Sequence, residues 1–423
     1  MEINQKIMSK FVINGGRRLS GSIDVAGAKN AILPLLAATL LTEEECAISN
    51  VPEILDVQSF IKILKDLGCE VTTEARTVTV RCGNIKKYIP DKKLCSSTRA
   101  SVIFMGALLS RLKKTEVVYP GGDKIGKRPI NIHIQAFKSL GAKVVEGETV
   151  KLSGDKLVGT ELFAESSVTG TENMVMASVF AKGKTIIKLA ALEPHVQQLC
   201  RFLKKMGARI NGIGTHTLVV EGVKKLHGAK VKVIPDMLEA GSFAVLAAAS
   251  KSELTINNVD HSHLDTVYEK FREIGINFDK SANSLIILRP QKGYKAVSIR
   301  TGVYPSLATD LQPPFGVLAT QCKGTTKIHD WIYEGRQGYL KELSKMGANV
   351  KIIDTHQAEV TGLTKLHPAK IESLDVRSGM TLVIASLIAE GKSVISGIHH
   401  IGRGYERLDE RLRNIGADIQ KID

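Results

Sequence analysis

Lys205-Met-Gly-Ala-Arg-Ile210 is one of six short phrases in this chain that share one pattern. In each phrase an apolar residue and a glycine follow an amphipathic stretch and precede residues suited to a strand. The other five are Asp66-Leu-Gly-Cys-Glu-Val71, Ser139-Leu-Gly-Ala-Lys-Val144, Glu273-Ile-Gly-Ile-Asn-Phe278, Lys345-Met-Gly-Ala-Asn-Val350 and Asn414-Ile-Gly-Ala-Asp-Ile419. Glycine is favoured just after a helix because it adopts a left-handed conformation at little cost. The phrases therefore predict six helices that each end at a glycine and lead into a strand.

A second recurring element lies upstream of each phrase. It is a short, apolar, small-residue segment followed by a turn and a β-branched strand, and the six segments are residues 31–41, 101–109, 174–181, 241–249, 315–320 and 380–389. These segments lack a wide polar face, so we expect them to be buried helices. A repeat of ~70 residues is longer than the common solenoid repeats. Six such units, three in each domain, predict two similar α/β domains.

Length and charge limit the number of domains and the classes of partner to expect. A chain of 423 residues is too long for one ordinary core, so two or three domains are expected. The net charge of +15 suits an anionic partner, which could be a nucleic acid, a charged surface or a small anionic substrate. Nucleic acid is disfavoured because the basic residues form no run longer than pairs such as Lys86-Lys87, and aromatic residues make up only 5% of the chain.

The cysteines and the N-terminus indicate the compartment. No two of the six cysteines have C-x-x-C spacing, which disfavours a zinc or redox site; they are Cys46, Cys69, Cys82, Cys95, Cys200 and Cys322. We therefore expect reduced, mostly buried thiols in a cytoplasmic protein. The N-terminal residues lack the apolar segment of a signal peptide, and no apolar run approaches the ~18 residues of a membrane span.

The starts of the six buried helices carry charged residues at one equivalent point, namely Lys29, Arg99, Glu172, Glu239, Asp310 and Arg377. Simple N-capping accounts for any one of them. It does not easily account for buried cations at a helix start, where the helix dipole disfavours positive charge. If the units pack around a pseudo-threefold axis in each domain, these starts converge, and two such ends would form a charged cleft for an anionic ligand.

The stretch Gly121–Pro129 combines three glycines, three cations and a single carboxylate, Asp123. Glycines let backbone N–H groups approach a ligand, and cations suit phosphate or carboxylate. A solvated surface loop is the alternative interpretation. Arg336 and Arg403 follow the fifth and sixth buried units in the same connecting position that Arg128 has here, and guanidinium groups bind such anions bidentately.

Six motifs together resemble one family over the chain from about residue 9. They are Ala26-Gly-Ala-Lys-Asn30, Arg99-Ala-Ser101, Gly126-Lys-Arg-Pro129, Thr309-Asp-Leu-Gln312, Leu374-Asp-Val-Arg377 and Gly402-Arg-Gly-Tyr-Glu-Arg407. In order and spacing they are similar to those of the UDP-N-acetylglucosamine 1-carboxyvinyltransferases, the enolpyruvyl transferases of the first committed peptidoglycan step. The sister enzymes that act on shikimate 3-phosphate share the fold but not the Ala-Gly-Ala-Lys-Asn phrase.

The resemblance implies an inverse α/β barrel pair. Residues 1–28 plus 235–423 would form one discontinuous domain and residues 29–234 the other, which carries the 121–129 loop as a lid. It implies closure of the cleft on the sugar nucleotide. It also implies neither a metal nor an organic cofactor, and no nucleic-acid or membrane partner. A monomer is the expected oligomeric state.

The resemblance also assigns substrate contacts. Phosphoenolpyruvate would be held by cations, namely Lys29, Arg128 and Arg403 with help from Arg336 and Arg377. The UDP-sugar would be held by Asn30, Arg99, Asp310, Pro129 beside Arg128, and the backbone around Thr169, Gly170 and Ile332. Asp310 would be the general base for the sugar 3′-hydroxyl, Asp123 the general acid, and Glu334 and Asp375 supporting carboxylates.

Departures from the family pattern concentrate at Asp123, where most members have the cysteine that fosfomycin alkylates. A carboxylate is a much poorer nucleophile toward an epoxide than a thiolate, so we expect an active, fosfomycin-insensitive enzyme. Alternatively, Asp123 only neutralises neighbouring cations. Gly335 and Ile103 are smaller departures in the nucleotide pocket. A catalytically idle UDP-sugar-binding paralogue and the shikimate-pathway activity are the competing functions.

Overall fold

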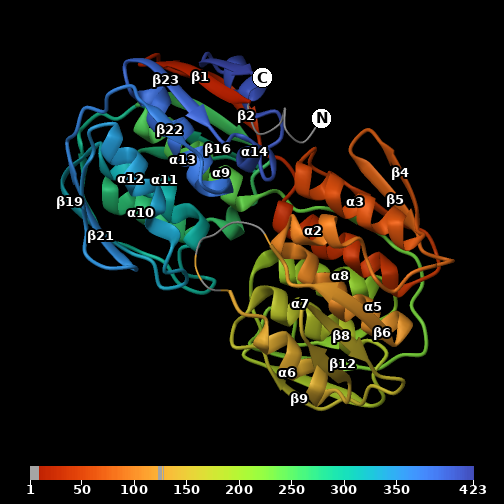
Figure 1. Ribbon diagram of the computed structural model, residues 1–423. Coiled ribbons are helices and arrows are strands. Elements are labelled where there is room, and N and C mark those ends of the chain that lie inside the picture. The colour runs from red at the N-terminus through yellow and green to blue at the C-terminus, as the bar shows by residue number, and fades with distance from the viewer. Residues whose placement is uncertain (1–8, 122–125, 127) are drawn as a thin grey trace. The chain divides into compact units, whose positions relative to one another are not determined.

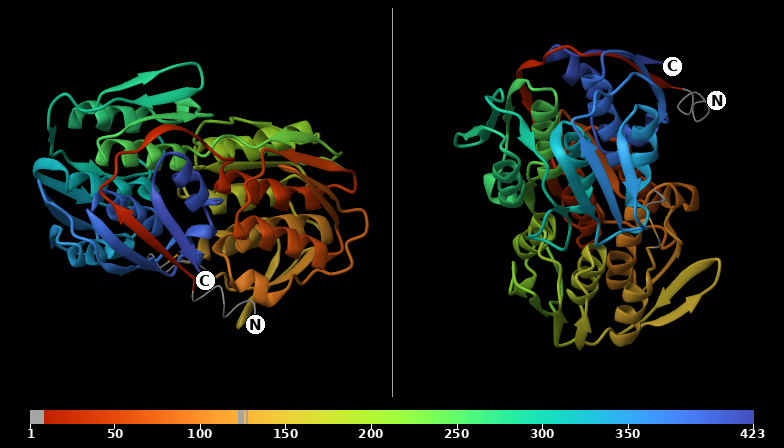
Figure 2. Two further views of the ribbon diagram at one scale, coloured as in Figure 1. Left: turned by 90° about the horizontal axis from the view of Figure 1, so that it is seen from above. Right: turned by 90° about the vertical axis from the view of Figure 1, so that its left-hand side faces the viewer.

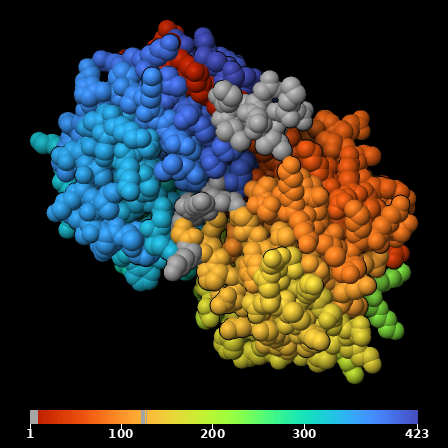
Figure 3. Space-filling model, in the orientation of Figure 1, coloured from red at the N-terminus to blue at the C-terminus, as the bar shows by residue number. Residues whose placement is uncertain are grey.

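A computed structural model describes residues 9–121, 126 and 128–423 (Figure 1). The described chain divides into two compact units. One comprises residues 9–26, 126 and 235–423, and the other comprises residues 27–121 and 128–234. In Figure 3, blue side chains form most of the visible surface of the first unit, and orange and yellow side chains form that of the second. Each unit has its own apolar core.

Each of the six phrases ends a helix, as predicted. The helices are α3 (Leu55–Leu67), α6 (Asn131–Ser139), α8 (Pro194–Lys205), α10 (Asp265–Ile274), α12 (Tyr339–Lys345) and α15 (Leu408–Asn414). The phrase glycines have φ between 87° and 102°; they are Gly68, Gly141, Gly207, Gly275, Gly347 and Gly416. A side chain is disfavoured at these angles, so the conformation explains why the phrases share glycine.

The strand that follows each glycine is an edge strand of its own sheet. These strands are β4 (Glu70–Glu74), β7 (Lys143–Glu146), β11 (Arg209–Asn211), β15 (Phe278–Lys280), β20 (Asn349–Ile352) and β24 (Asp418–Ile422). Each pairs antiparallel with the second strand of its sheet, namely β5 (Thr77–Arg81), β8 (Thr149–Ser153), β12 (Thr217–Glu221), β16 (Ser284–Ile287), β21 (Gln357–Gly362) and β1 (Lys10–Gly15). Three such sheets belong to each unit.

The third strand of each sheet follows a buried helix. These strands are β3 (Cys46–Ser49), β6 (Lys114–Val118), β10 (Lys184–Lys188), β14 (Glu253–Asn257), β19 (Cys322–His329) and β23 (Gly391–Ser396). Five of the sheets add a parallel strand at the far edge, namely β13 (Lys230–Lys232), β9 (Glu161–Phe163), β2 (Ser20–Asp24), β17 (Tyr294–Lys295) and β22 (Lys370–Glu372). The short strand β18 (Ile299–Arg300) also pairs with β19.

The two ends of the described chain meet in one sheet. Strand β1 lies between β23 and β24, so that Phe11 pairs with Ile395 on one side and Lys421 on the other. The Ser9 hydroxyl also donates a hydrogen bond of 2.7 Å to Asp423. The last repeat thus takes its second strand from the start of the chain.

The six small-residue segments form buried helices (Figure 2). They are α2 (Lys29–Ala38), α5 (Phe104–Leu112), α7 (Val168–Ser178), α9 (Met237–Ala249), α11 (Gln312–Ala319) and α13 (Val376–Ile388). Several of these helices begin before the apolar segment that predicted them, because their first turn contains polar residues. Helix α5 packs on α7, and α11 packs on α9 and α13. Within the described chain, no helix is long and apolar enough to cross a membrane.

The prediction of six reduced cysteines is wrong for one pair. Cys69 and Cys82 form a disulfide that joins the open ends of β4 and β5, where the register pairs Glu70 with Arg81. A search for C-x-x-C spacing misses a pair that only the hairpin register brings together. The other four cysteines are free and buried, as predicted. Burial raises the pKa of three of these thiols to about 12; they are Cys95, Cys200 and Cys322.

Candidate active site

Asp310 lies between two buried arginines. It is in a single 3₁₀ turn (Thr309–Leu311) that leads into α11. Its Oδ1 is 2.6 Å from Arg336 Nη2, and its Oδ2 is 3.0 Å from Arg377 Nε. The two arginines are only 3% and 4% exposed, whereas the Asp310 side chain is 24% exposed, so the cations are buried and the carboxylate remains accessible. The structure therefore brings together three residues that the sequence assigned to the site.

Asp375 completes this cluster from the start of α13. Its carboxylate caps the helix by accepting hydrogen bonds from the backbone N–H groups of Arg377 and Ser378, and it lies 3.6 Å from Arg336 Nη1. Burial works against the charge on Arg336, but Asp310 and Asp375 outweigh it and raise the pKa of the guanidinium. Arg336 thus has a second anionic partner within the chain itself.

Asp330 is a site residue that the sequence analysis did not single out. It is fully buried; its Oδ2 accepts a hydrogen bond of 2.6 Å from the Thr309 hydroxyl, and its Oδ1 accepts from the backbone N–H groups of Ile332 and Tyr333. The carboxylate therefore ties the Asp310 turn to the segment around Ile332. An aspartate that begins a turn was the available signal, because such residues accept hydrogen bonds from backbone N–H groups further along.

Arg403 and Glu334 belong to the same unit. Arg403 directly follows α14 (His399–Gly402) and is partly buried. Glu334 lies against Gly126 of the predicted lid, where an added β-carbon would approach its Oε2 to 2.5 Å. Gly126 also has a φ of 135°, a backbone conformation that favours glycine. Asp123, in the same loop, lies outside the described residues.

In the other unit, Lys29 and Asn30 begin α2. Lys29 Nζ is 2.8 Å from Asp56 Oδ2, and Asp56 is 3% exposed. The Thr98 hydroxyl donates to the same carboxylate oxygen over 3.3 Å. Asp56 was not identified from the sequence, because it lies in the first turn of α3, a helix with no other site signal.

Arg99 contacts the end of the predicted lid. It starts a short 3₁₀ segment (Arg99–Ile103) before α5, and its Nη2 donates to the carbonyl oxygens of Arg128 and Pro129. Three residues assigned to substrate binding are thus neighbours. These backbone carbonyl oxygens help to direct the side chain of Arg99.

His133 links Thr169 to the interior of its unit. Its Nδ1 lies 2.9 Å from Asn173 Nδ2, and its Nε2 lies 3.4 Å from the Thr169 hydroxyl. Asn173 Oδ1 accepts from the Gly106 N–H at 2.7 Å, which assigns Nδ2 as the donor to the histidine. Burial, assisted by Arg99, lowers the pKa of His133 to about 3. His133 is therefore a neutral imidazole with its proton on Nε2.

Comparison with known proteins places the chain in a family. The sequence profile of the EPSP synthase (3-phosphoshikimate 1-carboxyvinyltransferase) family matches residues 13–412. A UDP-N-acetylglucosamine 1-carboxyvinyltransferase 2 of Caldanaerobacter subterraneus subsp. tengcongensis is 42% identical over 419 residues, which cover 98% of this chain and 100% of the relative. The chain belongs to the UDP-N-acetylglucosamine 1-carboxyvinyltransferase family. A second relative with this name, from Bacteroides thetaiotaomicron, is 41% identical over 435 residues, covering 98% of this chain and 100% of that protein.

Solved structures confirm the predicted enolpyruvyl-transferase fold for this family member. The enolpyruvyl transferase NikO from Streptomyces tendae superposes with a TM-score of 0.89 at 22% identity, covering 98% of this chain and 99% of that one. An EPSP synthase from Acinetobacter baumannii gives 0.77 at 18% identity, covering 98% of this chain and 100% of that one. At these identities the likeness shows the fold alone.

Two of the six charged helix starts in this carboxyvinyltransferase family member have their carboxyl groups buried within their own unit. Glu239 is 2% exposed; it forms a bidentate pair with Arg411 at 2.7 and 3.1 Å and accepts from the Ala26 N–H. Glu172 is 1% exposed, and its Oε1 has no hydrogen-bond partner among the described residues. Their place at a helix start suggested a ligand, but both carboxyl groups face the interior.

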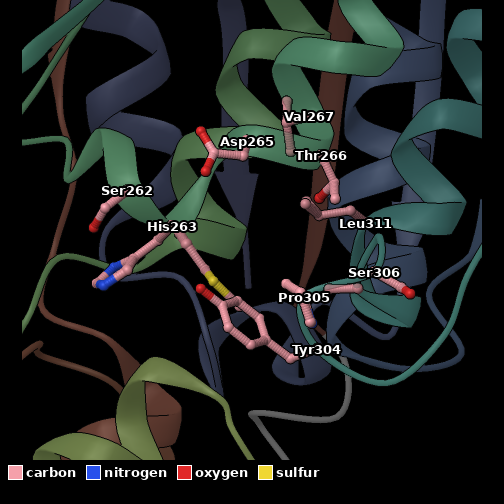
Figure 4. A pocket seen from close by; sticks show the side chains of 11 residues that line it. Ser262, His263, Asp265, Thr266, Val267, Tyr304, Pro305, Ser306 and Leu311 are labelled. Atoms are coloured by element: carbon pink, nitrogen blue, oxygen red, sulfur yellow. The ribbon is translucent and has the colours of Figure 1, made fainter. Parts of the chain in front are cut away.

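A small pocket lies beside the Asp310 turn (Figure 4). It encloses about 370 Å³, including the space open to solvent, and Ala308 and Leu311 form part of its wall. The side chains of His263, Tyr304 and Thr266 also line it. None of the residues assigned to substrate binding is among its lining residues, so this hollow is not the predicted active site.

Proposed function

We propose that this protein transfers the enolpyruvyl group of phosphoenolpyruvate to the 3′-hydroxyl of UDP-N-acetylglucosamine and releases phosphate, the first committed step of peptidoglycan synthesis in the cytoplasm. The observation that carries the proposal is the 42% identity to a protein of that name over 98% of this chain and the full length of the relative. We also propose that residues 1–28 plus 235–423 and residues 29–234 are its two functional domains, with 121–129 as the lid.

In the proposed reaction, Asp310 accepts the proton of the sugar 3′-hydroxyl while C3 of phosphoenolpyruvate is protonated. The sugar oxygen then bonds to the cationic C2, which gives a tetrahedral adduct. Loss of a proton from C3 and of the phosphate from C2 restores the double bond in the product. The two guanidinium groups within 3.0 Å of Asp310 favour the ionised carboxylate that a general base requires.

Cations would supply the binding of phosphoenolpyruvate. We assign Lys29, Arg128 and Arg403 to this substrate, with Arg336 and Arg377 acting through N–H groups that Asp310 does not use. Preorganised cations stabilise charge that develops on the adduct and on the leaving phosphate. Asn30, Arg99, Pro129, Thr169, Gly170 and Ile332 would bind the UDP-sugar, and Glu334 and Asp375 would support the cations.

Asp123 is the proposed general acid and the reason for the proposed fosfomycin insensitivity. An aspartate can donate a proton as the usual cysteine does, but it reacts poorly with an epoxide. An Asp123→Cys variant should turn over and lose activity on exposure to fosfomycin, whereas the unmodified protein should keep its activity. A cysteine variant that stays active in the presence of the drug would show that residue 123 does not determine sensitivity.

The decisive assay measures phosphate release from phosphoenolpyruvate with UDP-N-acetylglucosamine, with shikimate 3-phosphate, and with neither acceptor. Release only with the UDP-sugar supports the proposal. Release with shikimate 3-phosphate would favour the activity that names the matching family profile. Release with neither acceptor, together with UDP-sugar binding, would favour a catalytically idle paralogue.

A further inference from the structure

Tyr405 is a buried tyrosine that contacts the cluster around Asp310. It lies between α14 and α15, is 2% exposed, and its hydroxyl is 3.3 Å from Arg377 Nη1. The Arg377 guanidinium carbon is also 5.5 Å from the centre of the tyrosine ring. The proposed reaction assigns no part to this residue.

The hydrogen-bond directions around Tyr405 follow from its second partner, Ser242 of α9. The Ser242 hydroxyl donates its only hydrogen to the Leu238 carbonyl oxygen over 2.7 Å. In the 3.1 Å contact between the two hydroxyl groups, Tyr405 must therefore be the donor. Its oxygen then accepts from Arg377, which gives a chain of donors that runs from Arg377 through Tyr405 and Ser242 to a backbone carbonyl.

This series of hydrogen bonds holds the Arg377 guanidinium at a second atom, in addition to the atom that Asp310 contacts. Asp310 Oδ2 engages Nε at 3.0 Å, and the Tyr405 hydroxyl engages Nη1. A guanidinium is planar, so its covalent attachment to Cδ and these two hydrogen bonds together fix its plane and the direction of its remaining edge. Within the described part of the chain, Nη2 of Arg377 takes part in no hydrogen bond, which leaves that edge for an anion.

We propose that Tyr405 is a positioning residue for substrate binding, because it orients Arg377 so that the Nη2 edge receives the carboxylate or phosphate of phosphoenolpyruvate. This inference rests on the proposed function. The phenol remains a neutral donor throughout, since burial raises its pKa above the usual value of 10.0. Its contribution is therefore geometric and does not depend on pH in the neutral range.

The test is a Tyr405→Phe variant, which keeps the ring and removes the hydroxyl. The KM for phosphoenolpyruvate should rise about 2- to 10-fold, the effect of one hydrogen bond, while the KM for the UDP-sugar stays unchanged. Tyr294→Phe is the matched control, because Tyr294 is a buried tyrosine of the same unit whose hydroxyl donates to the Ala248 carbonyl at 3.2 Å. This control should leave both KM values unchanged.

A double-mutant cycle separates positioning from core packing. If Tyr405 acts through Arg377, then Tyr405→Phe should add nothing further in an Arg377→Lys background. A rise of equal size in both backgrounds, or an equal rise in both KM values, would overturn the inference.

Calorimetric titration with phosphoenolpyruvate, in the absence of the UDP-sugar so that no turnover occurs, tests the inference by binding alone. Weaker binding to Tyr405→Phe than to the unmodified protein supports the positioning role. Equal affinities overturn it. Failure of the proposed function would instead show as absence of phosphate release from the unmodified protein.

Discussion

Two regions, the Asp310 turn in one unit and the His133 network in the other, stabilise the starts of buried helices in different ways. Around Asp310 the groups are charged, and Arg336 and Arg377 are paired with that one carboxylate. Around His133 the groups are a neutral imidazole, an amide and a hydroxyl that hydrogen bond to one another. A charged cluster suits proton transfer and anion binding, whereas a neutral network orients donors and acceptors for recognition. Equivalent places in a repeat have thus acquired different chemistry.

Two glutamates show the same contrast. Glu239 forms a bidentate pair with Arg411, whereas Glu172 at the equivalent place of another repeat has an oxygen without a partner among the described residues. Burial raises the pKa of both carboxyl groups, and Arg411 opposes this effect only for Glu239. The unpaired glutamate therefore favours its neutral form, which needs no counter-ion. The four predictions below test this difference.

Asp310→Asn should have the largest effect. The amide cannot accept a proton as a base, so phosphate release should fall by about 10²- to 10⁴-fold. An Asp279→Asn variant, on an exposed strand of the same unit, is the control and should keep its rate. Retention of more than a tenth of the activity by Asp310→Asn would show that the charged cluster does not supply the base.

Glu239→Gln should destabilise its unit by about 3–5 kcal/mol, because it leaves the largely buried Arg411 without its charged partner. Urea unfolding followed by circular dichroism measures the change. Glu172→Gln is the matched variant and should lower the free energy of unfolding much less than Glu239→Gln does, because no cation loses a partner. Equal losses for the two variants would remove the distinction between the paired and the unpaired glutamate.

Asn173→Ala should lower the free energy of unfolding by about 1–3 kcal/mol, because the Gly106 N–H and His133 Nδ1 lose their partner in the buried neutral network. Asn277→Ala, at an exposed position, serves as the control in the same unfolding experiment. If the two variants were equally stable, the neutral network would contribute nothing to its unit.

The smallest effect concerns pH. Burial, with a smaller contribution from Glu193, raises the pKa of Glu172 well above 4.5, so the folded state retains a proton that the unfolded state loses. The contribution of Glu172 to the free energy of unfolding has its full value below pH 4.5. It declines as the pH rises toward the pKa of Glu172 in the folded state. Glu172→Gln should flatten that decline between pH 4.5 and 8, as measured by thermal unfolding. An unchanged slope would show that Glu172 is ionised in the folded protein.

Local chemistry explains which parts of the site were predictable. Arg99, Asp310 and Arg377 stand out in the sequence because charged residues at buried helix starts conflict with the apolar pattern around them. Asp56 and Asp330 do not stand out, because an aspartate in a first turn or a loop is common. Their partners, Lys29 and Thr309, are distant in the sequence or become neighbours only through the fold.

The sequence by itself determined the six helix ends, because a glycine with positive φ is a local requirement that each phrase satisfies alone. It also determined which residue types could handle an anion. Only the tertiary structure decided how they pair: that Asp310 joins two arginines, that Glu239 faces Arg411 while Glu172 has no such cation, and that Cys69 meets Cys82. Ion pairs and disulfides depend on distances between atoms from separate segments, and those distances exist only once the chain has packed.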